Sequence, residues 1–364
     1  MLHCGIVGLP LSGKSTIFNV ITGAGAEVKP YAGGRIDPNR AVVDVPDSRF
    51  DRLAQVHRPK KTTPAQVEFV DLAGLSRGAG KGEGLGNAFL SFVADADALI
   101  HVIRCFNNPD APHPEGSVDP VRDWDIINME LTYRDLAVIE NRLSKLAGKK
   151  NLPPEEKAEQ ALLERCKSWL FEEKFLKDLE LTDSERRSLR GFTFLTEKPQ
   201  IIVLNMDEST VELASAPNGA ALEARVGLGR DTAITLYGRL EMDLLDVSDD
   251  EAAEFTQGLP IDRPGRERLI SSAYAALGLI SFFTCGPDEV RAWTLHDGEN
   301  AVDAAGAIHS DLARGFIRAQ VVSYSDYEKF GDSYANCRDE GVLKLEGRDY
   351  RVKDGDIIEI RFNV

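Results

Sequence analysis

Residues 8–16 carry the sequence Gly-Leu-Pro-Leu-Ser-Gly-Lys-Ser-Thr. This stretch fits the phosphate-loop pattern G-x-x-x-x-G-K-S/T, and its place in the chain supports the match. An apolar run, residues 2–7, precedes it, and an apolar-periodic stretch that contains Ile17 and Val20 follows it. Strand, loop and helix in this order are the context in which the pattern has its meaning. The sequence therefore predicts a binding site for a nucleoside triphosphate.

The expected roles inside the loop follow from its chemistry. A glycine-rich backbone lets successive N–H groups converge on a phosphate chain, and the start of the helix adds positive partial charge. We expect Lys14 to act as a catalytic residue at the β- and γ-phosphates, and the Ser15 hydroxyl to ligate Mg²⁺. The predicted nucleotide-binding residues of the loop are Leu9, Pro10, Leu11, Ser12, Gly13, Lys14, Ser15 and Thr16.

A second motif, Asp71-Leu72-Ala73-Gly74, directly follows the apolar run 67–70. In phosphate-loop GTPases an Asp-x-x-Gly here closes the γ-phosphate site, so we expect Asp71 at the metal and Gly74 as the catalytic switch glycine. The next residue is Leu75, where Ras-like enzymes carry the glutamine that orients the attacking water. Leucine forms no hydrogen bond, so another group orients the water or hydrolysis is very slow. His101 is one conceivable helper, although a histidine inside a strand is more often a packed core residue.

A third motif, Asn205-Met206-Asp207-Glu208, follows the apolar run 201–204. GTPases usually have Asn-Lys-x-Asp here, with the aspartate paired to guanine. Glu208 keeps a carboxylate but extends it by one methylene, and a misplaced charged contact costs about 1.5–3 kcal/mol. The motif weakens the case for GTP without deciding the base.

Composition excludes several other classes of protein. The chain has 364 residues and a formal net charge of −16, which argues against broad adhesion to nucleic acid or to an anionic membrane. No apolar run approaches the roughly 18 residues of a membrane span. The first apolar run leads straight into the phosphate loop, which predicts a core strand and not a signal peptide. We therefore expect no membrane association and no specific DNA binding.

The order of the patterns predicts an α/β fold with insertions. Short apolar runs alternate with glycine-rich loops up to about residue 122, which is typical of a sheet with helices on both faces. From 123 to 190, helical spacing predicts a hairpin of two helices whose stripes form a common core; the stripes are Ile126, Met129, Leu136, Ile139, Leu143 and Leu146, then Ala161, Leu162, Cys166, Trp169, Leu170 and Phe175. Strand signals return at 199–205, so the predicted segments are 1–122, 123–190, 191–278 and 279–364. The last is β-rich, with strands expected at 280–284, 316–322, 350–352 and 357–362.

Together these motifs resemble the YchF subfamily of Obg-related proteins, also called Obg-like ATPases. The resemblance covers essentially the whole chain, and residues 282–294, Phe-Phe-Thr-Cys-Gly-Pro-Asp-Glu-Val-Arg-Ala-Trp-Thr, are very specific to that family. Further matching stretches are 8–10, 13–16, 36–39, 45–47, 71–75, 81–87, 115–120, 205–208 and 354–356.

The resemblance implies a G domain, an inserted coiled coil and a C-terminal TGS domain of the β-grasp type. It also implies Mg²⁺-dependent ATP binding with slow hydrolysis, association with ribosomes in the cytoplasm, and a link to translation and stress responses. Contacts to adenine carry over to Asn205, Met206 and Glu208. A hydrophobic residue at the water-orienting position is also a family property, which matches Leu75.

Three positions depart from the family pattern. Leu11 stands where asparagine is usual and where related enzymes hold potassium. Arg35 replaces the threonine of the first switch, and Leu236-Tyr237-Gly238-Arg239 replaces a small serine-containing turn. Three hypotheses stay open: a slow ATPase switch linked to ribosomes, a nucleotide-binding module with little hydrolysis, and a translation-associated protein that prefers GTP.

Overall fold

The chain divides into two compact units in a computed structural model that describes residues 2–23, 39–71, 93–207, 233–247, 251 and 264–363. The first unit spans Met1–Val42 and Glu68–Leu269, and the second spans Val43–Val67 and Ile270–Val364. The C-terminal unit thus includes a segment from the first quarter of the sequence. The segment boundaries expected from sequence at 122, 190 and 278 stay a prediction.

A six-stranded sheet forms the centre of the first unit, in the order β2-β4-β1-β5-β6-β7. Its strands are β1 (His3–Val7), β2 (Asn39–Asp44), β4 (Gln66–Asp71), β5 (Ala98–Arg104), β6 (Gln200–Asn205) and β7 (Ala233–Leu236). The ladders from β4 through β1, β5 and β6 to β7 are all parallel. Every residue of β5 and β6 is buried, as expected for central strands that are covered on both faces.

The carboxyl ends of these parallel strands lie at one edge of the sheet, and this edge organises the site. The phosphate loop follows β1, while β4 ends at Asp71, β5 at Arg104 and β6 at Asn205. Ligands of open α/β sheets bind outside this edge. Motifs separated by up to about two hundred residues in sequence are therefore brought together by strand order alone.

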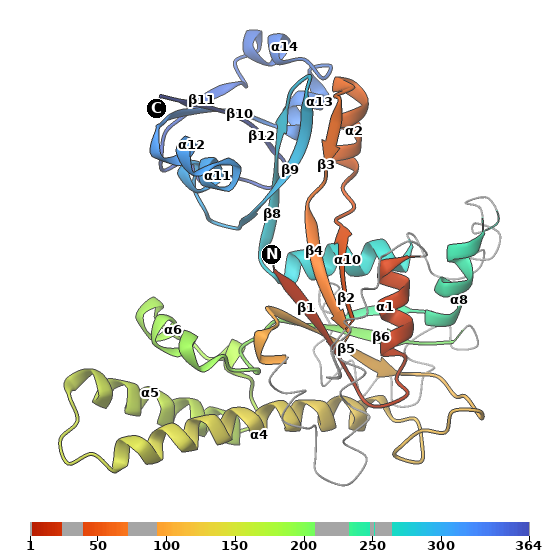
Figure 1. The fold of residues 1–364 in the computed structure, drawn as a ribbon, viewed down its shortest axis with the longest axis vertical. Helices are drawn as coiled ribbons and strands as arrows, with labels where there is room; N and C mark the ends of the chain where they lie inside the picture. Colours follow the sequence, from red (N-terminus) through yellow and green to blue (C-terminus); the bar gives the residue numbers. More distant parts are fainter. Residues whose placement is uncertain are drawn as a thin grey trace, which may run out of the picture. The chain divides into compact units, whose positions relative to one another are not determined.

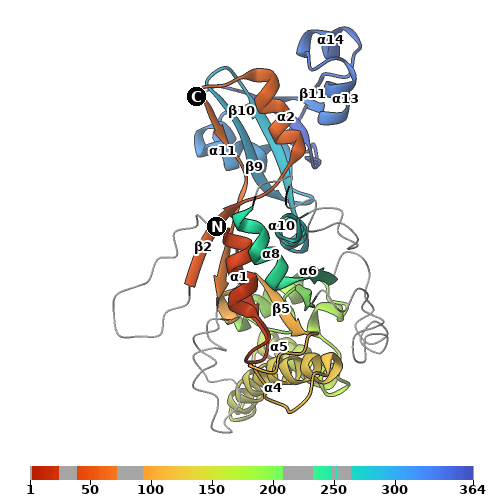
Figure 2. The ribbon, with the colours of Figure 1, turned by 90° about the vertical axis from the view of Figure 1, so that its right-hand side faces the viewer.

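Helices pack around this sheet. The helix after the phosphate loop, α1, contacts α8, and Figure 2 shows the two next to each other. The described helices of the first unit are α1 (Lys14–Thr22), α4 (Pro120–Ala147), α5 (Pro154–Phe171), α6 (Asp183–Leu189) and α8 (Gly238–Asp243), with short 3₁₀ turns at Leu176–Asp178, Arg190–Phe192 and Leu244–Asp246. Helix α10 (Gly265–Ala276) spans the boundary between the two units.

The two longest helices, α4 and α5, form the predicted hairpin (Figure 1). The Asp119 carboxylate accepts a hydrogen bond from Arg122 N and caps α4, and Pro120 occupies the first turn. The hairpin core is confirmed, because one buried cluster contains predicted residues of both helices: Leu136, Ile139 and Leu143 of α4, and Leu162, Cys166 and Leu170 of α5. Two residues of the predicted stripes are exceptions: Met129 is 49% exposed, and Ala161 is also exposed.

Asp135 fixes α4 to the segment that precedes β6. Its carboxylate is fully buried and accepts hydrogen bonds from Leu195 N at 2.9 Å, from Thr196 N at 2.8 Å and from Thr196 Oγ1 at 2.8 Å. Arg134 pairs with the same carboxylate at 3.0 Å. These bonds satisfy a buried charge that would otherwise be costly, so they set the position of the hairpin relative to its own sheet.

The second unit contains its own six-stranded sheet, in the order β11-β10-β12-β8-β9-β3. Ala301, Ala304 and Ala305 of α11 pack on one face of it, against Ile280 and Phe282. Its elements are α2 (Ser48–His57), β3 (Lys61–Thr63), β8 (Leu279–Cys285), β9 (Glu289–His296), α11 (Ala301–Ile308), α12 (Ser310–Arg314), β10 (Phe316–Ser323), α13 (Tyr324–Lys329), α14 (Tyr334–Asp339), β11 (Lys344–Glu346) and β12 (Asp356–Phe362). The strand predicted at 350–352 is wrong: Arg351 forms only an isolated bridge with Asn300.

In the part of the chain that the structure describes, no helix is long and apolar enough to cross a membrane.

Candidate nucleotide-binding site

The phosphate loop joins β1 to α1 in the conformation that its glycines permit. Gly8 has φ +150° and Gly13 has φ +95°. A Cβ on Gly8 would lie 2.4 Å from Val102 O, and one on Gly13 would lie 2.1 Å from Asn205 Nδ2. Because no side chain fits at either place, both glycines are needed for the close approach of the loop to the strand ends.

Lys14 begins α1, but its side chain folds back over the loop. Its Nζ donates to Gly8 O at 3.0 Å and to Leu9 O at 2.7 Å, and the residue is 4% exposed. Burial lowers the pKa of Lys14 to about 8, and the negative charge of Asp71 opposes the shift. The ammonium group is therefore held inside the loop by carbonyl oxygens that an anion can replace.

Ser15 and Asp71 meet at the start of α1. The Ser15 hydroxyl donates to Asp71 Oδ2 at 3.1 Å, across 56 residues of sequence. Asp71 is the last residue of β4 and is 2% exposed. A hydroxyl and a carboxylate are oxygen ligands of the type that Mg²⁺ prefers, so this pair fits the expected metal.

Asn205 connects two loops at the end of β6. Its Nδ2 donates to Ser12 O at 3.0 Å, and its Oδ1 accepts from Gly238 N at 3.1 Å. The residue is 4% exposed, so these bonds are shielded from water. A Cβ on Gly238 would lie 2.7 Å from Asn205 Oδ1, which explains why glycine stands there. One amide thus fixes the phosphate loop to the loop after β7.

Met206 lies beside this amide, and its side chain is part of the core. Its N–H donates to Leu236 O at 2.8 Å, and its side chain packs with Tyr237 and Leu240. The residue is 3% exposed. Of the residues predicted at the base, the structure therefore places Asn205 and Met206 at the sheet edge next to the phosphate loop.

The predicted residues differ in how far the structure describes them. Leu9 and Ser12 are buried in the loop, Pro10 and Leu11 are exposed, and Thr16 is half-buried in the first turn of α1. Gly74 and Glu208, together with Leu75 and Arg35, lie outside the described residues. The loop residues, Asp71 and Asn205 are brought together, and the metal and base predictions can be tested on them.

His101 is a buried strand residue and not an exposed helper at the phosphates. It lies in β5 opposite Val7 and is 1% exposed. Burial, and secondarily the positive charge of Lys14, lower the pKa of His101 to about 3, so its imidazole is neutral at physiological pH. This agrees with the packed-core alternative for this histidine.

Sequence reasoning missed Arg104, the residue at the end of β5. It is 2% exposed, and its guanidinium donates to Leu11 O of the phosphate loop at 3.4 Å. An arginine that directly follows the apolar run 98–103 is the signal that could have drawn attention to it, because arginine is almost never fully buried without a partner.

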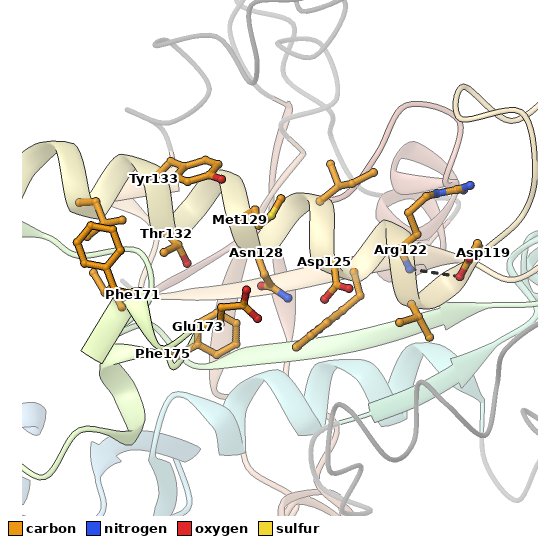
Figure 3. A pocket seen from close by; sticks show the side chains of 15 residues that line it. Asp119, Arg122, Asp125, Asn128, Met129, Thr132, Tyr133, Phe171, Glu173 and Phe175 are labelled. Carbon is orange, nitrogen blue, oxygen red and sulfur yellow. Dashed lines mark hydrogen bonds between the residues drawn. The ribbon is translucent and has the colours of Figure 1, made fainter. Parts of the chain in front are cut away.

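A separate groove of about 880 Å³ runs along the first half of α4 (Figure 3). Aromatic and apolar side chains that include Met129, Tyr133 and Phe175 line it, with the carboxylates of Asp125 and Glu173. No phosphate-loop residue is among its lining residues, so the groove is distinct from the nucleotide site.

Comparisons with known families match both parts of the chain. Residues 3–141 match a family described as 50S ribosome-binding GTPase, and residues 279–363 match YchF-GTPase_C, described as a protein of unknown function. The first match covers most strands of the sheet that carries the phosphate loop, and the second covers the β-rich C-terminal part.

Curated relatives and a solved structure match over the full length. The chain is 41% identical to the ribosome-binding ATPase YchF of Escherichia coli O157:H7 over 366 residues, with 99% of each chain covered. It is also 41% identical to the protein of that name in Bacillus subtilis strain 168, with both chains fully covered. The structure of the Schizosaccharomyces pombe YchF GTPase matches with a TM-score of 0.86 and 34% identity, covering 99% of this chain and 97% of that one.

These likenesses confirm the predicted α/β class with its phosphate-loop G domain. They also confirm the resemblance drawn from the motifs, since identity above 30% extends over whole chains. The chain therefore belongs to the YchF family of phosphate-loop nucleoside triphosphatases.

Proposed function

We propose that this chain binds ATP at the phosphate loop, hydrolyses it slowly and works as a switch on the ribosome. The observation that carries the proposal is the convergence of Lys14, the Ser15–Asp71 pair and Asn205 on one loop. The names of its relatives, ribosome-binding ATPases, support the activity and the partner.

Each residue has a role that follows from its chemistry. Backbone N–H groups of the loop, a donor that Pro10 lacks, bind the phosphates, and Lys14 exchanges its bonds to Gly8 O and Leu9 O for bonds to phosphate oxygens. Ser15 and Asp71 would hold Mg²⁺, Asp71 through a water molecule. When bound, Mg²⁺ neutralises phosphate charge and draws the phosphate oxygens into one geometry.

Slow hydrolysis of ATP follows from the sequence of residues 71–75, which contains the switch glycine. Gly74 donates its N–H to the γ-phosphate and moves on hydrolysis, as the switch glycine of this class does. Leu75 contributes no hydrogen bond to the attacking water. His101 is buried and does not replace the missing glutamine. Hydrolysis is therefore slow in this proposal, and a module that binds ATP with little hydrolysis is its limiting case.

The preference for ATP over GTP rests on the family resemblance, and the base motif only weakens the case for GTP. Met206 replaces the usual lysine, and Glu208 replaces the aspartate that pairs with guanine. The relatives' names divide on this point, since the bacterial proteins are named ATPases and the yeast structure a GTPase. GTP is therefore the second candidate.

Ribosome association implies a cytoplasmic protein without membrane or specific DNA binding. The helical hairpin and the C-terminal β-rich unit, which the family resemblance identifies as a TGS domain, are the surfaces proposed to contact the ribosome. In this proposal the sequence segments 1–122 and 191–278 form the G domain, and 123–190 and 279–364 form the two additions. The structure groups residues 43–67 and 270–278 with the second unit instead.

Phosphate release in the presence of Mg²⁺ and ATP tests the proposal. Lys14→Met is expected to abolish release and to weaken ATP binding at least about a hundredfold, since it removes a charged bond to phosphate worth about 1.5–3 kcal/mol together with a long-range attraction. Lys198→Met is the matched control, because Lys198 is half-buried and its Nζ also donates to two backbone carbonyls, those of Ala94 and Ala96, outside the loop. Unchanged release in Lys14→Met would refute the proposed site.

A further inference from the structure

Arg104 is an arginine buried next to the phosphate loop. It is the last residue of β5 and is 2% exposed. Its Nε donates to Phe106 O at 3.0 Å, its Nη1 donates to Leu11 O at 3.4 Å, and its guanidinium carbon lies 4.6 Å from the centroid of the Phe106 ring. Within the described residues no carboxylate lies within ion-pair distance of it. The negative charge of Asp123 acts on Arg104 from beyond that distance and opposes the effect of burial. A buried cation without a direct ion pair is costly, so its presence here needs an explanation.

The explanation lies in the position of Arg104 beside Asn205. The two residues are paired in the register of β5 and β6, and each is the last residue of its strand. Arg104 holds the carbonyl of Leu11, and Asn205 holds the carbonyl of Ser12. The last residues of two neighbouring strands therefore donate hydrogen bonds to two successive carbonyls of the phosphate loop.

Holding these carbonyls sets the direction of the loop's N–H groups. The peptide bond is planar and trans, so an inward carbonyl of Ser12 turns the N–H of Gly13 to the opposite side. The peptide held by Arg104 starts at Leu11, which is 53% exposed and has φ +62°, a conformation that side chains rarely adopt. A strained residue at the exposed tip keeps its conformation only where its surroundings fix it.

We propose that Arg104 is a positioning residue for phosphate binding, which holds the tip of the loop through Leu11 O while Asn205 holds it through Ser12 O. This inference rests on the proposed nucleotide site and adds a residue to it. The positive charge of Arg104 also favours phosphate binding. Only the negative charge of Asp123 acts on the guanidinium, without a direct ion pair, and a phosphate chain bound at the loop adds further negative charge. The contribution of Arg104 therefore grows with the number of phosphates on the nucleotide.

The test compares nucleotides that differ in phosphate number. Affinities of AMP, ADP and a non-hydrolysable ATP analogue are measured by titration calorimetry, with weak ligands measured by displacement. Arg104→Met is expected to weaken ADP and the ATP analogue at least about tenfold, equivalent to about 1.4 kcal/mol, and AMP less than about threefold. Arg104→Lys keeps the charge but not the planar fork, so it is expected to recover part of the loss.

Arg134→Met is the matched control. Arg134 also donates to a backbone carbonyl, Thr193 O at 2.9 Å, but it does so in the hairpin. The control variant is expected to lose thermal stability and to keep all three affinities. If Arg104→Met does not fold, Arg104→Lys carries the test, with an expected loss of about three- to tenfold for ADP and the ATP analogue.

Two results would overturn the inference. One is unchanged affinity for ADP and the ATP analogue in the Arg104 variants, and the other is an equal loss for AMP, which would indicate general loosening of the site. Failure of the wild-type protein to bind any of the three nucleotides would instead overturn the proposed function, so the two failures can be told apart.

Discussion

Replacing Asn205 by alanine removes the amide that joins the phosphate loop to the loop after β7. The substitution leaves Ser12 O and Gly238 N–H without their partner, and both bonds are buried. An unsatisfied buried group costs about 1–3 kcal/mol, which gives about 2–6 kcal/mol for the pair. Water can enter beside the half-exposed Gly13 and bring the cost towards the lower value. We therefore expect Asn205→Ala to lose about 2 kcal/mol of the free energy that orders the two loops.

Calorimetric titration with the ATP analogue measures this loss, because the loops must be ordered for phosphate to bind. A deficit of about 2 kcal/mol corresponds to a roughly thirtyfold weaker dissociation constant. Urea unfolding followed by the fluorescence of the tryptophans reports the accompanying loss of stability. Hydrogen exchange at Gly238 N–H, which should become faster in the variant, locates the effect in the loop after β7.

Asn128→Ala is the control for the loss of a buried asparagine. Asn128 accepts from Gln200 Nε2 at 3.3 Å on the hairpin side of the sheet, away from the loops. It is expected to reduce stability by about 1 kcal/mol and to leave the affinity unchanged. An Asn205→Ala variant that binds the analogue within threefold of wild type would refute the reasoning that this amide orders the loop.

Three further predictions concern the charge of Lys14, the backbone conformation of Gly13 and the bonds that hold the helical hairpin through Asp135. Burial lowers the pKa of Lys14 to about 8 and bound phosphate raises it again, so binding takes up a proton above pH 8. The affinity of the wild-type protein for the ATP analogue, measured by titration from pH 7 to 9.5, should be constant below pH 8 and fall by up to about tenfold per pH unit above it. A constant affinity over the whole range would contradict this. Gly13→Ala should weaken binding of the ATP analogue at least about tenfold, since strain at positive φ costs about 1–3 kcal/mol and the new Cβ would meet Asn205. The control Gly116→Ala, at φ +80° with no atom within 4 Å of the new Cβ, should bind the analogue like the wild-type protein. Equal affinities of the Gly13→Ala variant and the wild-type protein would show that the contact with Asn205 is relieved. Asp135→Asn should lower the free energy of unfolding by about 2–4 kcal/mol, because an NH₂ group would face the N–H of Thr196. An unchanged midpoint of urea unfolding would show that the bonds of Asp135 contribute little to stability.

The parts of the site that sequence could predict are those with local signals. The phosphate loop lies between an apolar run and an amphipathic stretch, and Asp71 and Asn205 each end an apolar run, so strand order alone brings them together. The hairpin was predictable for the same reason, because the spacing of Ile139 and Leu143 in one helix and of Leu162 and Cys166 in the other is helical, and all four residues are buried. Met129 fits the same spacing but is exposed, because periodicity gives a face and not what covers it.

The remaining features depend on contacts between distant residues. Arg104 and Asn205 bond to carbonyls 93 and 193 residues away, and no local pattern marks the partner of a buried polar group. Strand β3 pairs with β9 across 228 residues at Lys61 and Glu289, so the grouping of residues 43–67 with the second unit has no local signal. The false strand at 350–352 illustrates the opposite case, since its β-type residues lack a strand partner.

Titration calorimetry of nucleotide-free wild-type protein, with non-hydrolysable ATP and GTP analogues in Mg²⁺, tests the central claim most directly. Potassium and sodium buffers are compared, because Leu11 stands where related enzymes hold potassium. The account predicts binding of the ATP analogue at least tenfold tighter than the GTP analogue, and loss of that binding in Lys14→Met. Tighter binding of the GTP analogue would show that Glu208 still selects guanine, and binding of neither would contradict the assignment of the phosphate loop as a working site.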